Sequence, residues 1–295
     1  MALNNLAQRF VVASVAIPAL LGALYFRQGI IWFVLCLVFA RLAAKEFLAL
    51  VAPDEPESTG YHPLFYLLYG GVFVTLFLAV SRHSLFGLHF EGLLPLLYGG
   101  LILAVAVLLS ILVFPPLLTQ KRLRTGGLVL GPFYLAGPFA LLTLIRLYGT
   151  SAEGAGLCIF TLAVAWFGDS VAMLFGKTFG GPKLYPTVSP GKTWSGAVGG
   201  LIGSASVVLF AKLFFLPSLP VGKGIALALF AGAFGQLGDL CESVLKRTTG
   251  VKDSGSSLPG HGGFLDRVDA LLFVTLVVFG ALQSGWLGFS LPSTR

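Results

Sequence analysis

Charged residues are scarce in this 295-residue sequence, at 11% where about 25% is usual in soluble domains. The apolar set AVILMFWYC makes up 56% of it, and the mean hydropathy is +0.91. These values exclude a disordered chain and a water-facing enzyme. At roughly 20 residues per helical span, the chain has room for about nine spans with modest loops. We therefore predict an all-α, polytopic integral membrane protein.

Cysteine is also rare, and Cys36, Cys158 and Cys241 form neither a CxxC pair nor a Cys/His cluster. Buried free thiols are therefore expected rather than disulfides or a metal site. The net charge of +7 does not require a nucleic acid partner, because Lys and Arg gather in the cytoplasmic loops of membrane proteins. The apolar run after Arg9 lacks a small-x-small cleavage site, which favours a first span over a signal peptide.

Nine apolar runs, separated by polar, Gly or Pro residues, are the candidate spans. Each is expected to be a helix, because lipid cannot satisfy open backbone groups. They cover residues 7–25, 28–51, 64–80, 92–114, 128–147, 154–175, 194–215, 222–246 and 266–286. We divide the chain into 1–150, with about five spans, and 151–295, with about four spans that carry the chemistry. Overlapping GxxxG patterns at 196–200 and 199–203 predict close helix packing.

Basic residues predict the orientation. With nine spans, thirteen of the nineteen Lys and Arg residues fall on the side of the N-terminus. The N-terminus is therefore expected in the cytoplasm of a cell inner membrane or its equivalent. Half of the twelve carboxylates fall at the cytoplasmic ends of spans six, eight and nine or in the loop between eight and nine. These six are Asp169, Asp239, Glu242, Asp253, Asp266 and Asp269.

The end of the eighth span carries Asp239, Glu242, Ser243 and Lys246 at i, i+3, i+4 and i+7, which is one helix face. Ionisable groups within a span are costly unless they face protein, water or metal. Two interpretations stay open, an internal Asp–Lys pair that holds helices together or a polar face that lines a cavity open to the cytoplasm.

The segment 248–269 is rich in glycine, and its backbone can approach a ligand closely and offer N–H groups to phosphate oxygens. Its cations, with those just before it, are Lys246, Arg247, Lys252, His261 and Arg267. Asp266 and Asp269 follow in the first turn of the ninth span. Carboxylates beside such a loop favour Mg²⁺ bound to a polyphosphate, with a merely solvated loop as the alternative.

The segment 180–194 after the sixth span is a second basic loop. Its Gly-Lys-Thr at 191–193 is not a Walker A motif, because Pro186 stands where that motif has its first glycine. A lipid-phosphate site accounts for its lysines, while Trp194 is explained by anchoring at the membrane interface.

These motifs together resemble the phosphatidate cytidylyltransferases, or CDP-diacylglycerol synthases. The resemblance is carried by Ser243-x-x-Lys246-Arg247, Lys252-Asp253-Ser254-Gly255, Leu258-Pro259-Gly260-His261-Gly262-Gly263 and Leu265-Asp266-Arg267-Val268-Asp269, with Gly238-Asp239-Leu240 and Ser189-Pro190-x-Lys192-Thr193-Trp194 upstream. The match is dense from about 166 to 269 and is not specific before that.

The resemblance implies an enzyme that joins CTP and phosphatidic acid to give CDP-diacylglycerol and pyrophosphate. It implies catalytic roles for Asp239, Asp266, Lys246, Lys252, Asp253 and His261. Substrate binding is implied for Ser243, Arg247, Lys183, Ser189, Lys192, Thr193 and Arg267. Asp239 and Asp266 are the expected metal ligands, with Glu242, Asp269 and Asp169 as further candidates. The expected cofactor is Mg²⁺ or Mn²⁺; a second cation and a homodimer stay open.

Two other function classes are considered. An enzyme of similar architecture could be a CTP-dependent polyprenol or phytol kinase, or a cytidylyltransferase for a different lipid. A transporter or lipid-binding protein would also place charges in its spans. The carboxylates cluster at one membrane face rather than near the midplane, which argues against a transporter. Since phosphatidic acid stays in the leaflet, we expect the cavity to open sideways between spans six to nine.

Overall fold

The computed structural model describes residues 14, 18–54, 61–81, 94–113, 119–257 and 262–291. Its elements in chain order are the 3-10 turn η1 (Phe26–Gly29), α2 (Ile30–Val51), α3 (Tyr61–Ser81), α4 (Leu94–Val113), α5 (Gln120–Ile145), α6 (Ser151–Phe179), β1 (Lys183–Tyr185), β2 (Ser189–Thr193), α7 (Trp194–Phe214), α8 (Val221–Thr248) and α9 (Leu265–Gln283). Eight of the predicted spans each correspond to one helix, and the span at 7–25 lies mostly outside the described residues. The all-α prediction is confirmed.

Within the described ranges, four helices are long and apolar enough to cross a membrane, namely α5, α6, α7 and α8. Shorter apolar stretches lie in α3 and α4, at His62–Leu78 and Leu97–Val113. Helix α2 is long enough to cross a membrane, but it is not among these four because it carries three charged residues, Arg41, Lys45 and Glu46. The chain is thus an α-helical membrane protein, while nine spans stay a prediction.

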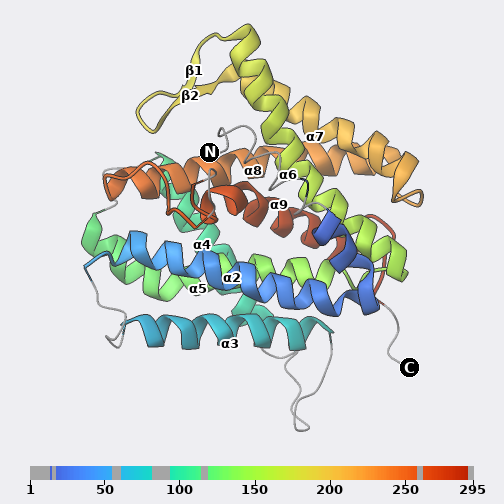
Figure 1. Cartoon of the computed structure of the whole chain (residues 1–295), viewed down its shortest axis with the longest axis horizontal. Coiled ribbons are helices and arrows are strands. Elements are labelled where there is room, and N and C mark those ends of the chain that lie inside the picture. Colours follow the sequence, from blue (N-terminus) through green and yellow to red (C-terminus); the bar gives the residue numbers. More distant parts are fainter. Residues whose placement is uncertain are drawn as a thin grey trace, which may run out of the picture.

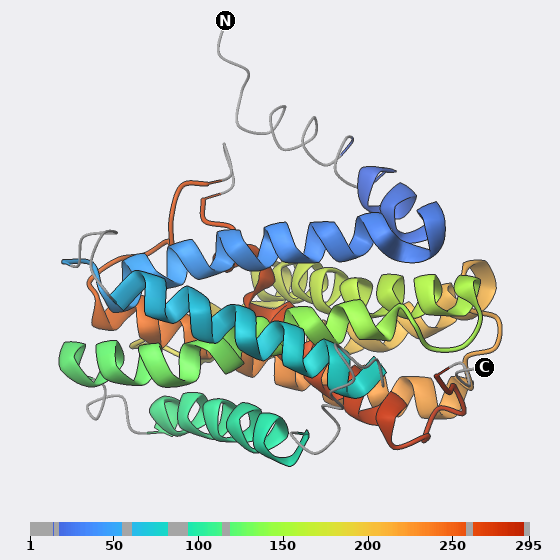
Figure 2. The same cartoon turned by 90° about the horizontal axis from the view of Figure 1, so that it is seen from below.

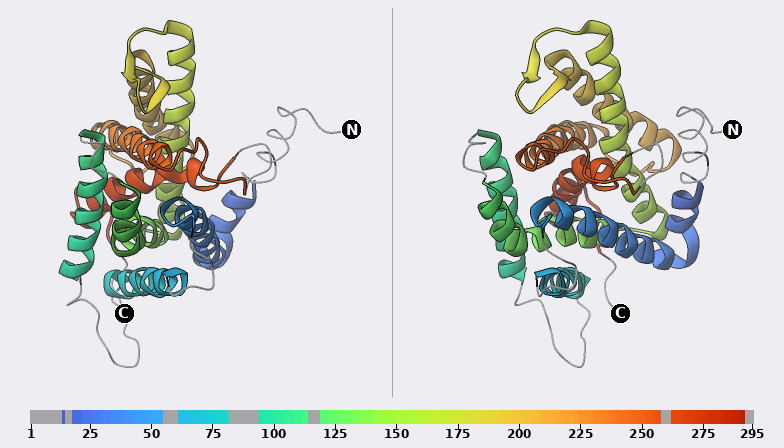
Figure 3. Two further views of the ribbon diagram at one scale, coloured as in Figure 1. Left: turned by 90° about the vertical axis from the view of Figure 1, so that its left-hand side faces the viewer. Right: turned by 60° about the vertical axis from the view of Figure 1, so that its left-hand side comes forward.

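Helix α5 lies at the centre of the bundle, in contact with α2, α3, α4, α6 and α9 (Figures 1 and 3). The Tyr134 ring of α5 lies between Phe47 of α2 and Phe273 of α9, at centroid distances of 6.0 Å and 6.3 Å. Gly131 permits this approach, because a Cβ there would lie 2.5 Å from the Phe47 ring. Figure 2 shows α4 along one edge of the bundle, where it contacts α5 and α8.

The helices run alternately between two ends of the bundle, as the predicted topology requires. At one end, the Tyr185 hydroxyl of the α6–α7 connection donates to the Leu112 carbonyl near the end of α4, at 2.8 Å. At the other end, the Gly149 amide between α5 and α6 donates to the Ser290 carbonyl after α9, at 2.8 Å. Connections that follow even-numbered helices therefore gather at one end, which we call the site end.

Helices α6 and α7 form a close pair that projects from the rest of the bundle (Figure 1). A Cβ at Gly196 would lie 2.8 Å from the Ala172 carbonyl oxygen, and one at Gly203 would lie 2.7 Å from Val171. The predicted role of the GxxxG patterns in helix packing is confirmed. The expected loop between these helices forms an antiparallel hairpin of β1 and β2, in which Tyr185 pairs with Ser189.

The three cysteines are free and buried, as expected.

Candidate active site

Lys246 stands at the centre of the polar face of α8. Its ammonium nitrogen lies 2.5 Å from Asp266 Oδ1 of α9 and 3.2 Å from Glu242 Oε1, one turn earlier on α8. Both Lys246 and Glu242 are buried. An Asp–Lys pair that links two helices, as considered from the sequence, is therefore present. The aspartate that pairs with Lys246 is Asp266 of α9 rather than Asp239 of α8. The other interpretation, a polar face that lines a cavity open to the cytoplasm, stays a prediction.

Asp239, two turns before Lys246, faces the hairpin instead. Its Oδ2 lies 2.6 Å from the Lys192 ammonium of β2, and each side chain is about a quarter exposed, at 27% and 25%. Arg247 adds a second link, since its Nε donates to the Val188 carbonyl at 3.2 Å. The structure thus brings the hairpin and α8 together, although they are separate motifs in the sequence.

Two further carboxylates lie beside these pairs. Asp269 of α9 is buried, and its Oδ1 accepts a hydrogen bond from its neighbour's amide, that of Ala270, at 2.7 Å. Asp269 is close enough to Asp239, Glu242 and Asp169 to interact electrostatically with all three. We call the whole set the carboxylate–lysine cluster; it consists of Asp169, Lys192, Asp239, Glu242, Lys246, Asp266 and Asp269.

Asp266 also organises the glycine-rich loop. Its Oδ2 accepts hydrogen bonds from the amides of Ser254, at 2.9 Å, and Gly263, at 3.2 Å. Gly263 must be glycine, because a Cβ there would collide with the Ser254 hydroxyl and lie 2.7 Å from the Gly255 amide nitrogen. The loop is thereby folded back on the first turn of α9, which places its backbone beside Lys246.

Glu46 of α2 is a site residue that the sequence reasoning missed. It is buried, and it accepts hydrogen bonds from the Ser254 hydroxyl at 3.0 Å and from the amides of Phe264 at 2.9 Å and Leu265 at 2.8 Å. It thus satisfies otherwise unpaired N–H groups at the start of α9. A signal was present, because Glu46 is an ionisable residue inside a predicted span, and such residues are functional candidates by default.

Several predicted site residues are not members of the cluster, although Arg267 is close enough to Asp169 to interact with it electrostatically. Thr193 is buried, and its hydroxyl caps α7 by accepting from the Gly196 amide at 3.1 Å. Ser189 begins β2, Ser243 is buried on α8, and Lys183, Lys252, Asp253 and Arg267 are exposed. The Arg267 carbonyl accepts from the Trp166 indole at 3.0 Å, which ties α6 to α9. His261 lies outside the described residues.

A small cavity adjoins the cluster among α6, α7, α8 and α9. Its polar lining consists of Asp169, Ser204 and Gln236, and the rest is largely glycine and small apolar residues. Glycine is required there, since a Cβ at Gly232 would lie 2.5 Å from the Ser204 hydroxyl. The cavity holds about 10 Å³, so it is no larger than a water molecule needs.

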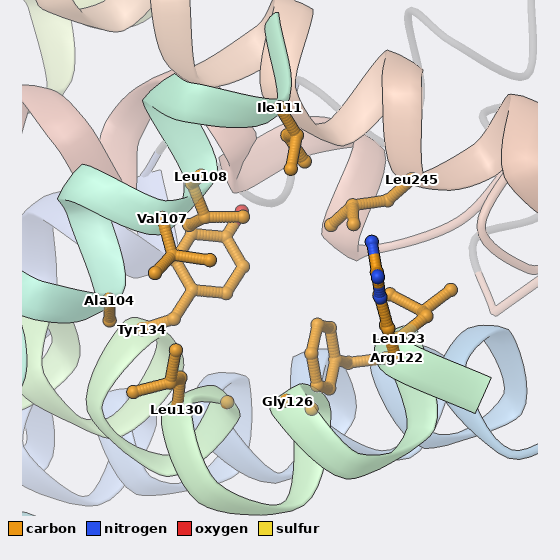
Figure 4. A pocket seen from close by; sticks show the side chains of 13 residues that line it. Ala104, Val107, Leu108, Ile111, Arg122, Leu123, Gly126, Leu130, Tyr134 and Leu245 are labelled. Carbon is orange, nitrogen blue, oxygen red and sulfur yellow. The ribbon is translucent and has the colours of Figure 1, made fainter. Parts of the chain in front are cut away.

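An apolar crevice lies on another side, between α4 and α5 (Figure 4). Leu108 and Ile111 of α4 face Leu130 of α5 across it, and Leu245, the neighbour of Lys246 in the chain, closes it. The Arg122 side chain lies at its rim and extends toward Leu245. The crevice therefore combines an apolar wall with one cation at the site end.

The cluster fits a hard divalent cation by the chemistry of its donors. Five carboxylates face two lysines and Arg267, which acts on Asp169, and Glu242 has no hydrogen-bond donor other than the Lys246 ammonium among the described residues. Within those residues, no group of three or more His, Cys, Asp or Glu side chains is arranged to hold a metal ion by itself. Mg²⁺ commonly takes one or two carboxylates and completes its shell with water and substrate phosphates.

The comparison with known families decides what kind of protein carries this cluster. The family model described as "Cytidylyltransferase family" matches residues 7–284. The chain belongs to the cytidylyltransferase family. The resemblance seen in the motifs is thereby confirmed, and the match includes the early spans, where the motifs were not specific.

Individual relatives agree with the family. A protein of Brucella abortus named phosphatidate cytidylyltransferase is 42% identical over 194 residues, which cover 65% of this chain and 70% of the relative. Proteins of the same name from Staphylococcus saprophyticus and Staphylococcus aureus are 46% and 47% identical over 128 residues, or 43% of this chain and 49% of each relative.

Proposed function

We propose that this protein transfers the cytidylyl group of CTP to phosphatidic acid, giving CDP-diacylglycerol and pyrophosphate. The observation that carries the proposal is the position of Lys246. Its ammonium group lies between the carboxylates of Asp266 and Glu242 near the C-terminal end of α8, beside the glycine-rich loop. Family membership supports the same reaction, and so do the names of the relatives. We place the site end in the cytoplasm of an inner membrane or its equivalent, where CTP is available.

The reaction needs no covalent intermediate and no general base. The phosphate of phosphatidic acid is already an anion at neutral pH, and one of its oxygens attacks the α-phosphorus of CTP. The bond from that phosphorus to the oxygen bridging to the β-phosphate breaks, and its electron pair leaves with pyrophosphate. The difficulty is to bring two polyanions together and to stabilise charge on the leaving group, which positioned cations do.

The chain's own cations suit this task because carboxylates hold them in place. Lys246 is fixed by Asp266 and Glu242, and Lys192 by Asp239, so both ammonium groups are oriented before substrate arrives. Amides of the loop around Ser254 and Gly263 are fixed by Asp266. We assign Lys246, Lys192 and Arg247 to the phosphates. Lys252, Asp253, Lys183 and Arg267 are exposed, and their roles at the substrate stay predictions.

We assign Mg²⁺, or Mn²⁺, to Asp239 and Asp266, with Glu242, Asp269 and Asp169 as supporting carboxylates. When bound, the metal ion would neutralise charge on the phosphates of CTP and its pyrophosphate product. His261 stays a predicted phosphate-binding residue.

Labelled CTP tests the proposal directly. Purified protein is incubated with phosphatidic acid and with CTP that carries the label in either the α- or the γ-phosphate. We expect the α-label to enter the lipid and the γ-label to leave as pyrophosphate. Transfer of the γ-label to a polyprenol or phytol would instead identify a lipid kinase, and no transfer of either label would contradict both.

A further inference from the structure

A second polar cavity, of about 590 Å³, lies at the site end between α2, α3 and the loop at 254–257. Its lining includes Arg41, Lys45, Ser256 and Ser257, and no residue of the carboxylate–lysine cluster takes part in it. Ser254 separates the two places, because its hydroxyl donates to Glu46 on the cavity side and its amide to Asp266 in the cluster. The cavity therefore borders the site described above through Glu46 and Ser254, and its two cations lie outside the carboxylate–lysine cluster.

Among the described residues, the cavity lining holds two cations, Arg41 and Lys45, against one carboxylate, Glu46. Arg41 and Lys45 stand at i and i+4 on α2, so they share one face. The Arg41 guanidinium lies 4.1 Å from the centroid of the Tyr66 ring and also donates to the Tyr66 hydroxyl, which holds it toward the cavity. In the part of the chain that the structure describes, neither cation forms an ion pair with a carboxylate. Glu46 does not compensate them, since its oxygens accept three hydrogen bonds elsewhere.

The two cations lie in the last third to half of α2. Helix α2 ends at Val51, so Arg41 lies about 15 Å and Lys45 about 9 Å from that end at 1.5 Å per residue. The exposed apolar residues Leu64, Leu67 and Leu68 of α3 follow Pro63 of the cavity wall and offer a surface for acyl chains.

We propose that this cavity binds an anionic phosphate group, through Arg41 and Lys45 with the hydroxyls of Ser256 and Ser257 as further donors. Basic pockets between membrane helices bind phosphate headgroups in this way. A lipid headgroup and a soluble phosphate share this chemistry, and the experiment below separates them. The proposal rests on residues outside the cluster, so it does not depend on the transfer reaction.

The test uses the full-length protein in phosphatidylcholine nanodiscs and a double variant, Arg41→Gln with Lys45→Gln. The matched control is Arg124→Gln with Lys121→Gln, which removes two exposed cations at the start of α5, outside the cavity. In one arm the nanodiscs also contain phosphatidylglycerol, and native mass spectrometry counts the molecules retained by the protein. In the other arm inorganic phosphate or pyrophosphate is added to phosphatidylcholine nanodiscs, and the shift in unfolding temperature is measured.

We expect the cavity variant to retain phosphatidylglycerol about fivefold more weakly for each cation removed, while the control binds like the wild type. A loss confined to the phosphate arm would assign the cavity to a soluble anion, which also supports the proposal. Equal binding by both variants and the wild type in both arms would overturn it. Lys45→Gln alone, at an exposed position, serves if the double variant unfolds, and an unchanged affinity there would count equally against the proposal.

Discussion

Glu46 and Ser254 lie 208 residues apart in the chain, and a hydrogen bond of 3.0 Å joins them. Ser254 in turn donates its amide to Asp266, at 2.9 Å. A buried carboxylate of α2 is thereby coupled, through one loop residue, to the partner of Lys246. This relationship connects the N-terminal helices to the C-terminal motifs that carry the chemistry.

Glu46→Gln is therefore expected to impair the enzyme, although Glu46 contacts no residue of the cluster directly. The amide cannot accept all three hydrogen bonds, and its NH₂ group faces N–H donors of Phe264 or Leu265. A buried donor left unpaired costs about 1–3 kcal/mol of stability. Displacement of the loop is expected to lower kcat by about tenfold to a hundredfold. Thermal unfolding in detergent and steady-state kinetics measure the two effects.

Glu153→Gln is the matched control for this prediction. Glu153 also accepts from a backbone amide at a helix start, that of Thr150 at 2.8 Å, but at the opposite end of the bundle. Glutamine serves equally well at this position of a capping box, so we expect stability and activity close to wild type. Similar losses in both variants would show that the effect of Glu46 is general destabilisation.

Substitutions of the two proposed metal ligands are expected to differ in their effect on the stability of the protein, but to lower its activity to a similar extent. Asp239→Asn removes a partly exposed pairing with Lys192 and should change the free energy of unfolding by less than about 1 kcal/mol. Asp266→Asn disturbs the bonds to Lys246, Ser254 and Gly263 and should destabilise the protein more. Each should lower turnover at least about a hundredfold, which is about 2.7 kcal/mol for one electrostatic contact.

A Mg²⁺ titration of activity completes this experiment, and metal binding measured by isothermal titration calorimetry gives a readout that is independent of turnover. A variant at Asp239 or Asp266 that folds and keeps near-wild-type turnover at limiting Mg²⁺ would show that its carboxylate is not a metal ligand. EDTA should abolish the activity of the wild type, and Mg²⁺ should restore it.

The helices and the cluster could be predicted to different degrees. Apolar runs located eight helices, and i, i+3, i+4 and i+7 spacing correctly placed Glu242 and Lys246 on one face. Spacing did not reveal that Lys192 pairs with Asp239, since this contact depends on how the α6–α7 pair folds over α8. Glu46 was missed for the same reason, because its partners are contributed by a loop more than 200 residues away.

Thr193 illustrates a second limit on predicting the role of a residue from a sequence motif. Its position in the family motif suggests substrate binding, but in the structure its hydroxyl is used to cap α7. A hydroxyl before a helical run is a capping signal in any sequence, and motif membership alone does not separate the two roles.

Thiol labelling tests which end of the bundle faces the cytoplasm. The native cysteines are buried, so they should react slowly with a membrane-impermeant maleimide. Cysteine introduced at Thr187, an exposed position in the hairpin, should react in inverted membrane vesicles and stay protected in intact cells. Cysteine at Ser218, exposed between α7 and α8, should show the opposite pattern. Labelling of Thr187→Cys only from outside would remove the proposed active site from the compartment that holds CTP.

The last prediction concerns how the lipid substrate reaches the cluster. The α4–α5 crevice is apolar, and it ends at Leu245 (Figure 4), the residue that precedes Lys246 in α8. We expect it to hold an acyl chain of phosphatidic acid. Gly126→Trp should fill it, because a Cβ at Gly126 meets no atom within 4 Å. The KM for a long-chain phosphatidate should rise about tenfold, which corresponds to the burial of roughly two methylene groups, with kcat unchanged.

Gly71→Trp on α3 is the matched control, since a Cβ there also meets nothing within 4 Å and the residue lines no part of the crevice. A short-chain phosphatidate provides a second control, because its tails do not extend far enough to need the crevice, and its KM should be unaffected in both variants. If Gly126→Trp leaves the KM for the long-chain lipid unchanged, the acyl chains do not use the crevice. The sideways opening would then have to lie between α6 and α9, the region that the sequence favours, and bulky substitutions at exposed positions of α6 would become the next test.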